Sequence, residues 1–192
     1  YLLDFVFLKR NWLQDQTTIR NTFHRLKSRR LPFWLLSHVE GTRLTPAKLE
    51  ESKKFARERG LPVMEETLLP RVKGFVSMVQ ELRDVSPPLV LYDTTLMYVD
   101  AKTGKTETAS GYPVGGPSTF SLFYRPSSHV HLHVKRYTMD ELPTTEAGLE
   151  KWLIDAFVAK QKLLADFRIT KKFPDPNPED ERLQFPSMDI PL

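Results

Sequence analysis

The tetrapeptide Glu40-Gly41-Thr42-Arg43 combines residue types that bind anions. It follows an apolar run, residues 31–39, and precedes a strongly signalled helix. Gly41 lets the backbone approach a ligand closely, Thr42 offers a hydroxyl, and Arg43 offers a planar fork of donors that fits two phosphate oxygens. A ligand that carries phosphate is therefore expected here. Taken alone, the tetrapeptide is more typical of a surface ion pair between Glu40 and Arg43 than of a ligand site.

Three histidines, His129, His131 and His133, alternate along a predicted strand and therefore share one of its faces. Alternating histidines can bind one zinc ion. No Asp, Glu or Cys lies in the adjoining positions to complete a ligand set, so a solvated polar face without metal is the favoured interpretation. His38 lies inside a predicted buried strand and is expected to be a hydrogen-bonded core histidine, not a base.

Four segments in register resemble the glycerolipid acyltransferase family, whose members move a fatty acyl chain from acyl-CoA to lysophosphatidic acid and related lysophospholipids. The Glu-Gly-Thr-Arg run after a hydrophobic strand resembles the family's third block. Residues 7–10, Phe-Leu-Lys-Arg, resemble the second block, and residues 68–75, Leu-Leu-Pro-Arg-Val-Lys-Gly-Phe, resemble the fourth. Residues 92–96, Tyr-Asp-Thr-Thr-Leu, resemble the next strand of the eukaryotic branch that acylates lysophosphatidic acid, lysophosphatidylinositol or lysocardiolipin.

This resemblance, which covers residues 1–165, implies the roles of individual residues. The implied substrate-binding residues are Arg10, Gly41, Thr42, Arg43, Pro70 and Arg71. Arg10 and Arg43 would bind the phosphate of the acceptor, whereas Pro70 and Arg71 would lie near the acyl-CoA channel. Glu40 is the implied catalytic-site residue, which would shape the pocket and reach the glycerol hydroxyl. The resemblance implies no metal and no cofactor, because acyl-CoA is a co-substrate.

One block of the family is missing from this sequence. That first block is an Asn-His pair with an Asp four residues further on, and its histidine is the general base for the acceptor hydroxyl. The chain also opens at Tyr1, in the middle of what should be a strand. We therefore expect a C-terminal fragment, inactive alone, that lacks the base and the N-terminal membrane helices.

Two functions follow from this reading. The first is acyl-CoA-dependent acylation of a lysophospholipid, foremost 1-acyl-sn-glycerol-3-phosphate, in phospholipid biosynthesis or remodelling. The enzyme would act at a membrane, that of the endoplasmic reticulum, anchored by segments outside this chain. The alternative is a non-catalytic module that keeps the phosphate site and binds a phospholipid or a partner protein.

Composition restricts the remaining possibilities. The 192 residues include no cysteine, which excludes disulfides and thiolate metal sites. No run of about 18 apolar residues is present, so no membrane-spanning helix is predicted within the chain. The net charge is +4, and basic residues gather in residues 20–30 and 48–59. These are either solvated helix faces or surfaces for anionic lipid headgroups, whereas nucleic acid is not expected because aromatic residues are not interleaved with them.

The elements that must position these residues are read from hydrophobic spacing and turn signals. Helices are predicted at residues 17–30, 46–59, 73–83 and 146–167, the second bounded by Thr45-Pro46 and Gly60. Strands are predicted at residues 33–39, 67–69, 89–99, 120–124 and 130–134, with a loop or hairpin over residues 100–117. The expected fold is α/β, a mixed sheet flanked by helices that is similar to glycerol-3-phosphate acyltransferase and incomplete at its N-terminus. An acyltransferase domain over residues 1–170 would precede a proline-rich mobile tail, residues 171–192.

Overall fold

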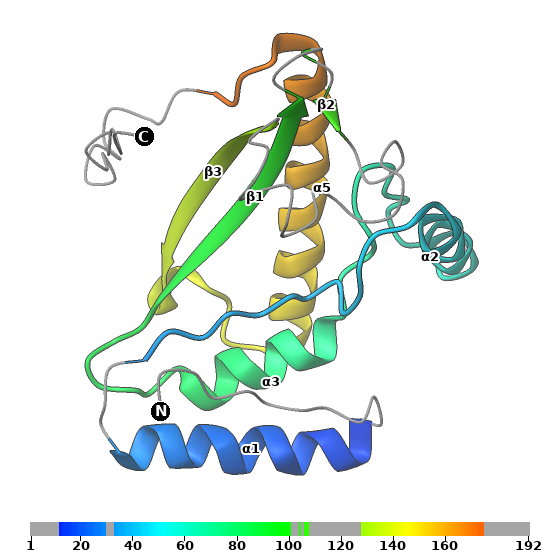
Figure 1. Cartoon of the computed structure of the whole chain (residues 1–192). Helices are drawn as coiled ribbons and strands as arrows, with labels where there is room; N and C mark the ends of the chain where they lie inside the picture. The colour runs from blue at the N-terminus through cyan, green and yellow to red at the C-terminus, as the bar shows by residue number, and fades with distance from the viewer. Residues whose placement is uncertain (1–11, 30–32, 101–103, 105, 108–127, 175–192) are drawn as a thin grey trace, which may run out of the picture.

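The computed structural model describes residues 12–29, 33–100, 104, 106–107 and 128–174 (Figure 1). The elements follow in the order α1 (Trp12–Arg29), α2 (Pro46–Glu58), α3 (Val72–Leu82), β1 (Val90–Asp100), β2 (Thr106–Glu107), β3 (Ser128–Thr138), a 3-10 turn η1 (Met139–Glu141) and α5 (Glu146–Thr170). The predicted site residue Arg10, the strand at 120–124 and most of the tail lie outside the described residues.

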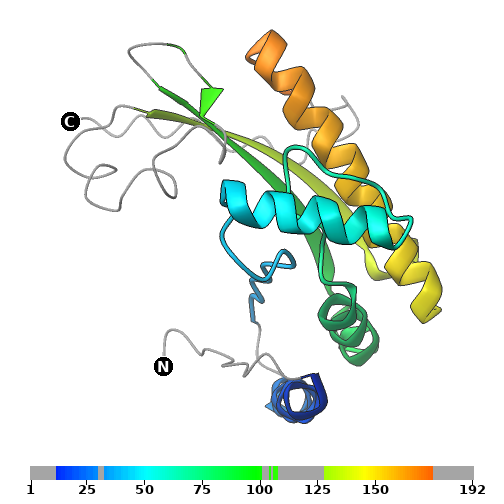
Figure 2. The same ribbon diagram turned by 90° about the vertical axis from the view of Figure 1, so that its right-hand side faces the viewer.

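The sheet has the order β2-β1-β3, and both of its strand pairs are antiparallel. The long β1–β3 ladder runs from Val90 opposite Thr138 to Asp100 opposite Ser128. α5 lies along one face of this ladder, as Figures 1 and 2 show. Helices packed on a sheet confirm the α/β class that the sequence predicts.

The main core lies where α3, α5 and the start of β1 meet. α3 buries one apolar stripe and α5 buries another along its first half, as the spacing predicts. The buried members of this core are Met64, Phe75, Val76, Val79, Met139, Leu142, Leu149, Leu153 and Phe157. α1 packs against α3 from below in Figure 1, through Ile19 and Phe23.

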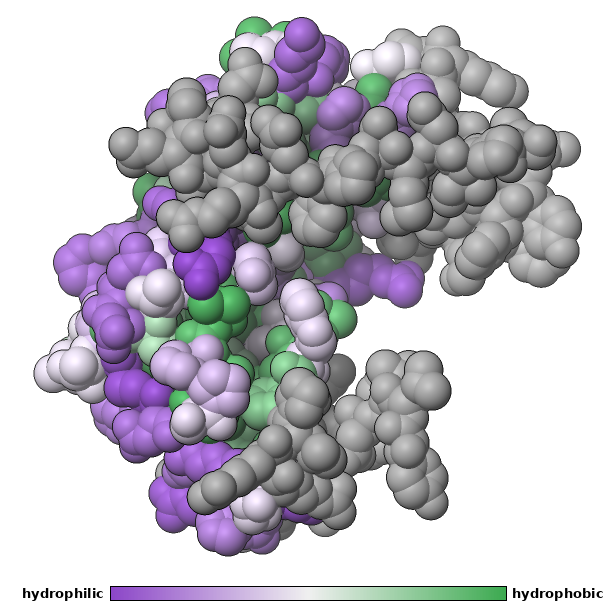
Figure 3. Space-filling model, turned by 90° about the vertical axis from the view of Figure 1, so that its left-hand side faces the viewer, coloured by the Kyte–Doolittle hydropathy of each residue, from purple (hydrophilic) through white to green (hydrophobic). Residues whose placement is uncertain are grey.

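The face of the ladder away from α5 stays open in the described structure. Leu96, Val130 and Leu132 on this face are 50%, 48% and 54% exposed. Figure 3, seen from the left-hand side of Figure 1, shows a group of hydrophobic residues bordered by hydrophilic ones. The ladder therefore buries Thr95, Met97 and Val99 on the face toward α5 and leaves apolar residues of the other face at the surface.

Two predicted strands are wrong. Residues 33–38 are extended but belong to no strand, and Trp34 and Leu36 there are 90% and 80% exposed. A strand needs a neighbour to pair with its backbone, and no described strand pairs with this segment. His38 is consequently exposed and not a core residue. Residues 67–69 also form no strand, because side chains take their backbone N–H groups: Leu69 N donates to Ser52 Oγ at 2.9 Å.

Candidate functional site

The Glu-Gly-Thr-Arg segment forms a tight turn before α2. The Gly41 N–H donates to the His38 carbonyl oxygen at 2.9 Å, which closes the turn. Gly41 has φ +69°, in the left-handed region where a side chain costs about 1 kcal/mol or more. The backbone path therefore favours glycine at this position, independently of any ligand.

Two segments that are distant in the sequence meet at this turn. The Arg71 N–H donates to the Val39 carbonyl oxygen at 2.8 Å, and the Leu68 N–H donates to Glu40 Oε2 at 3.1 Å. The side chain of Arg71 lies against Gly41, so that a Cβ atom at Gly41 would stand 2.7 Å from Arg71 Nε. The third and fourth matched blocks thus form one structural unit, which we call the Gly41 turn, residues 39–43 with 68–71.

The segment before Leu68 is itself anchored to α5. The Glu65 N–H donates to Gln161 Oε1, and Glu66 forms an ion pair with Arg168. Thr67 is buried beside them. Because Leu68 follows directly, these contacts fix the backbone N–H that orients Glu40.

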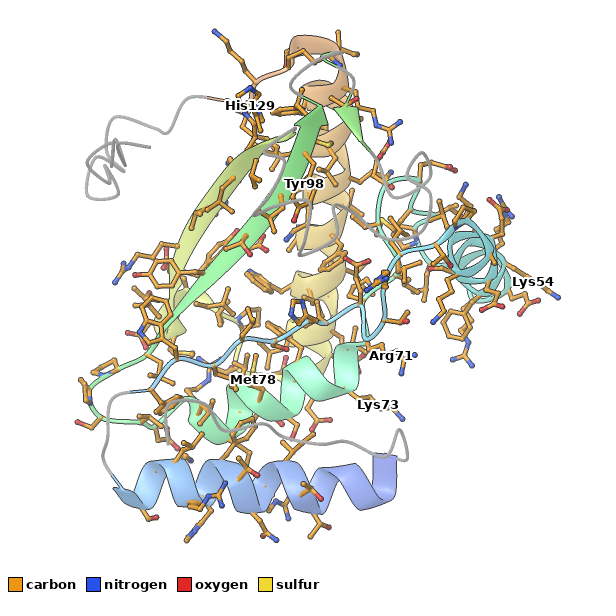
Figure 4. All side chains as sticks on the ribbon, viewed as in Figure 1. Lys54, Arg71, Lys73, Met78, Tyr98 and His129 are labelled. Carbon is orange, nitrogen blue, oxygen red and sulfur yellow. The ribbon has the colours of Figure 1, made fainter. Side chains whose placement is uncertain are left out.

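Cationic side chains surround the turn. Lys48 Nζ, in the first turn of α2, donates to Thr42 Oγ1 at 2.5 Å. Arg43 and Arg71 are exposed, and Arg71 is the N-cap residue of α3. Figure 4 shows Arg71 and Lys73 extending to the same side from the start of α3. The arrangement concentrates positive charge around a backbone that is already hydrogen-bonded.

The start of α3 strengthens this positive potential. The first turn of α3 contains no acidic residue, and no side chain caps it. A helix N-terminus carries a partial positive charge, so cations are disfavoured there and anions are favoured. Arg71 and Lys73 stand at this end of the helix, so the helix start favours an anion that binds beside Arg71.

Glu40 is the acidic member of the site. Burial raises the pKa of its carboxyl, while the Leu68 N–H and the charges of Lys160 and His38 act in the opposite direction. Lys160 is itself fixed, because its Nζ donates to Asp93 Oδ1 at 2.6 Å and to the Thr94 carbonyl at 2.7 Å. Asp93 belongs to the matched segment 92–96, so three matched segments contribute to the environment of Glu40.

The predicted site residues are distributed as follows. Gly41 and Arg71 are in contact, and Thr42 and Arg43 continue the same turn. Glu40 is anchored beneath it, and Pro70 is buried next to Arg71. Lys48 and Lys160 were not predicted. Lys48 carried one local signal, its place in the first turn of a helix after Thr42, whereas nothing near Lys160 in the sequence connects it with Glu40.

The histidines of β3 lie in a different environment. His131 packs edge-on against Phe167 with ring centroids 4.9 Å apart, and His133 packs against Phe173 at 5.6 Å. Both are half-buried and only His129 is exposed, so the predicted solvated face is not wholly solvated. Burial lowers the pKa of His133. In the part of the chain that the structure describes, no three His, Cys, Asp or Glu side chains are grouped to bind a metal ion.

Among the helices that the structure describes, none is both long enough and apolar enough to cross a membrane.

Comparison with known proteins identifies related sequences. The profile of the family described as "Acyltransferase C-terminus" matches residues 121–190. The 1-acyl-sn-glycerol-3-phosphate acyltransferase 3 of Arabidopsis thaliana is 36% identical over 172 residues, which are 90% of this chain and 42% of that protein. The 1-acyl-sn-glycerol-3-phosphate acyltransferase 2 of Brassica oleracea is 37% identical over 171 residues, 89% of this chain and 40% of that protein.

A human protein extends this range of relatives. The 1-acyl-sn-glycerol-3-phosphate acyltransferase delta of Homo sapiens is 29% identical over 175 residues, 91% of this chain and 42% of that protein. The chain therefore spans less than half the length of these curated relatives. No solved structure matches the chain.

Proposed function

Because this chain belongs to the glycerolipid acyltransferase family, we propose that it is part of an enzyme that acylates a lysophospholipid. The acceptor we propose is 1-acyl-sn-glycerol-3-phosphate, and the donor is acyl-CoA. The names of the relatives support the acceptor, and the resemblance of four sequence blocks supports the donor. The proposed site of action is a membrane, that of the endoplasmic reticulum.

The joining of two matched blocks at the Gly41 turn carries this proposal. The Arg71 N–H donates to the Val39 carbonyl and the Leu68 N–H donates to the Glu40 carboxylate, and these hydrogen bonds fix the turn without a ligand. The donors left at the surface are side chains that suit phosphate, chiefly the guanidinium groups of Arg43 and Arg71. A preorganised turn with planar cationic donors supports recognition of a phosphate monoester.

Thr42 would complete the grip on the phosphate. Its hydroxyl oxygen accepts from Lys48, which leaves the hydroxyl proton available for a phosphate oxygen. Arg43 would bind two oxygens of the phosphate. The resemblance alone assigns Arg71 to the acyl-CoA channel, but its side chain lies against Gly41, so we propose that Arg71 and the start of α3 neutralise the remaining charge of the phosphate. Arg10, from the second block, would add a further contact.

The reaction itself requires a hydroxyl placed beside a thioester. The hydroxyl oxygen attacks the thioester carbonyl carbon, so that a C–O bond forms and the C–S bond breaks. The base takes the hydroxyl proton, and the departing thiolate leaves as the thiol of CoA after it receives a proton. Glu40, beneath the phosphate turn, would orient the glycerol hydroxyl, and the base would come from the family's first block, outside these residues.

The missing first block keeps a second function open, a module that binds the phosphate of a lipid without turnover. An assay of the full-length gene product separates the two, with oleoyl-CoA and either lysophosphatidic acid or the matching monoacylglycerol. We expect release of CoA when lysophosphatidic acid is the acceptor and none when the monoacylglycerol is the acceptor. Binding of lysophosphatidic acid without any release of CoA would instead support the module. The 192 residues alone should show a rate lower by about 10² to 10⁴, the usual loss without a general base.

A further inference from the structure

α2 carries an aromatic residue that the core does not use. Leu49 and Ala56 are its buried residues, and the helix stands apart from α3 and the sheet in Figure 1. Phe55 is 43% exposed, and the guanidinium of Arg59 lies 4.4 Å above its ring centroid. A large aromatic ring kept at the surface beside a cation is a common feature of interfaces.

Cations from two elements share this side of the molecule. Lys54, whose side chain is 79% exposed, extends outward from α2 to the same side as Arg71 and Lys73 from α3 (Figure 4). Between Pro46 and the C-cap residue Arg59, α2 has five basic and three acidic residues, so it is positive overall. The hydrogen bond from Lys48 to Thr42 joins this helix to the Gly41 turn.

We propose that Lys54, Phe55 and Arg59, here called the outer basic surface, bind the surface of an anionic lipid bilayer. Phe55 enters the headgroup region, while Lys54 and Arg59 contact lipid phosphates. The binding brings the Gly41 turn to the level of the headgroups, where a lysophospholipid presents its phosphate. This interaction requires no catalysis, so it stands or falls separately from the proposed acyl transfer.

The chemistry of the outer basic surface favours a lipid over other polyanions. A bilayer accepts cations at irregular spacing and gives a single aromatic ring an apolar layer to enter. Single-stranded nucleic acid would need several stacking rings along a basic groove, and Phe55 is the one aromatic residue of this surface. The acids Glu51 and Glu58 lie on the same helix, so the net attraction depends on the basic excess.

A matched pair of lysines tests the location of the surface. Lys54 and Lys162 are 79% and 80% exposed, and each forms an i,i+4 ion pair, with Glu58 and Asp166 respectively. Lys54→Glu and Lys162→Glu therefore change the net charge equally at similar sites, one on α2 and one on α5. Lys54→Gln and Lys162→Gln repeat the comparison without adding an acid.

The measurement is sedimentation of the 192-residue chain with phosphatidylcholine vesicles, with and without phosphatidylserine. The wild type should bind the vesicles that contain phosphatidylserine and should not bind those made of phosphatidylcholine only. Lys54→Glu should lower its partition coefficient about tenfold and Lys54→Gln about fivefold, since each basic residue near such a surface contributes on the order of a fivefold factor. Lys162→Glu should change it less than twofold. Circular dichroism checks that every variant keeps its helices.

Salt separates the contribution of Phe55 from that of the cations. Phe55→Ala should lower binding about fivefold at low salt and at high salt, because burial of an apolar ring is not screened. The effect of Lys54→Glu should instead shrink as salt rises. If the Lys54 and Lys162 variants lower vesicle binding equally, the net charge of the protein explains the binding without the outer basic surface, and the proposal is overturned. Absence of vesicle binding, with retention on RNA or on an acidic peptide, would also overturn it.

Discussion

The Gly41 turn and the histidine face of β3 each gather polar side chains within a few residues, but their surroundings differ. At the turn, protein groups satisfy the backbone and the acid, while the guanidinium groups of Arg43 and Arg71 face solvent. On β3, the rings of His131 and His133 pack on Phe167 and Phe173. The charged donors of the Gly41 turn are therefore accessible to a ligand, whereas the histidine rings of β3 contribute to packing.

The charges around the two regions also differ. Positive groups from α2, α3 and α5 surround Glu40 and Gly41, at a helix start without acids. Around His133, burial favours the neutral ring. Residue types that could bind a ligand therefore indicate a site only where the fold leaves them hydrated and surrounded by unbalanced charge.

Loss of the Arg43 guanidinium should give the largest effect. In the full-length protein, Arg43→Ala should lower kcat/KM for lysophosphatidic acid by about 100-fold or more, because a bidentate charged contact is lost. Arg43→Lys should restore only part of it, since an ammonium cannot reproduce the planar fork. Steady-state kinetics with each substrate varied in turn measures this. If the KM for acyl-CoA rises and that for the acceptor does not, Arg43 binds the donor instead.

Two glycines with similar backbones offer a controlled test of the turn. Gly41 and Gly60 have φ +69° and +64°, but a Cβ atom would contact Arg71 only at Gly41 and meets nothing within 4 Å at Gly60. Both alanine variants should lose about 1 kcal/mol of stability. Gly41→Ala should also weaken phosphate binding about tenfold by displacing Arg71, and Gly60→Ala should not. Thermal unfolding and titration with lysophosphatidic acid measure the two effects, and equal binding losses would contradict the role of Arg71.

Much of the fold could be predicted from local chemistry. α2 begins at Pro46, directly after Thr45, because the Thr45 hydroxyl accepts from the Lys48 N–H, and it ends before Gly60. Caps and helical spacing depend on residues a few positions apart, so the sequence displays them directly. The strands at 33–39 and 67–69 could not be judged this way, because pairing depends on distant segments.

The candidate site was predictable in its residue types but not in its assembly. Glu-Gly-Thr-Arg indicated an anion, and the turn has the glycine conformation and exposed arginines that such a role requires. The contact between Glu40 and Leu68 spans 28 positions, and that between Lys160 and Asp93 spans 67. Neither pair has a periodic signal that links its members, so only the folded chain reveals them.

Glu40→Gln separates the charge of this residue from its hydrogen bond. The amide oxygen can still accept from the Leu68 N–H, so we expect the turn to persist while acyl transfer falls about tenfold. The raised pKa of Glu40 means that wild-type stability gains as pH falls through that pKa towards the ordinary 4.5, and the amide lacks this gain. As the pH is lowered from 7 to 4, the free energy of unfolding of the wild type should therefore rise relative to that of Glu40→Gln, as denaturant unfolding measures. The opposite trend would show that the carboxylate stabilises the fold.

The histidine face should give the smallest effect on function. Replacing His131 and His133 together with Gln should cost about 1 kcal/mol from lost ring contacts, and activity of the full-length enzyme should stay within about twofold. The lowered pKa of His133 predicts that wild-type stability falls as pH drops below about 6.5, and the variant should lose part of this dependence. Activity should also survive dialysis against a chelator. Stoichiometric zinc whose removal abolishes activity would refute this assignment.

The central claim is that the Gly41 turn recognises a phosphate monoester, and calorimetric titration tests it most directly. Lysophosphatidic acid and the monoacylglycerol of the same chain length differ only in the phosphate, so the ratio of their Kd values isolates its contribution. The wild type should bind the phosphorylated lipid at least about tenfold more tightly, as a bidentate charged contact implies, and Arg43→Ala should remove most of this preference. A preference that persists unchanged in Arg43→Ala, or a wild type that binds both lipids equally, would contradict the account.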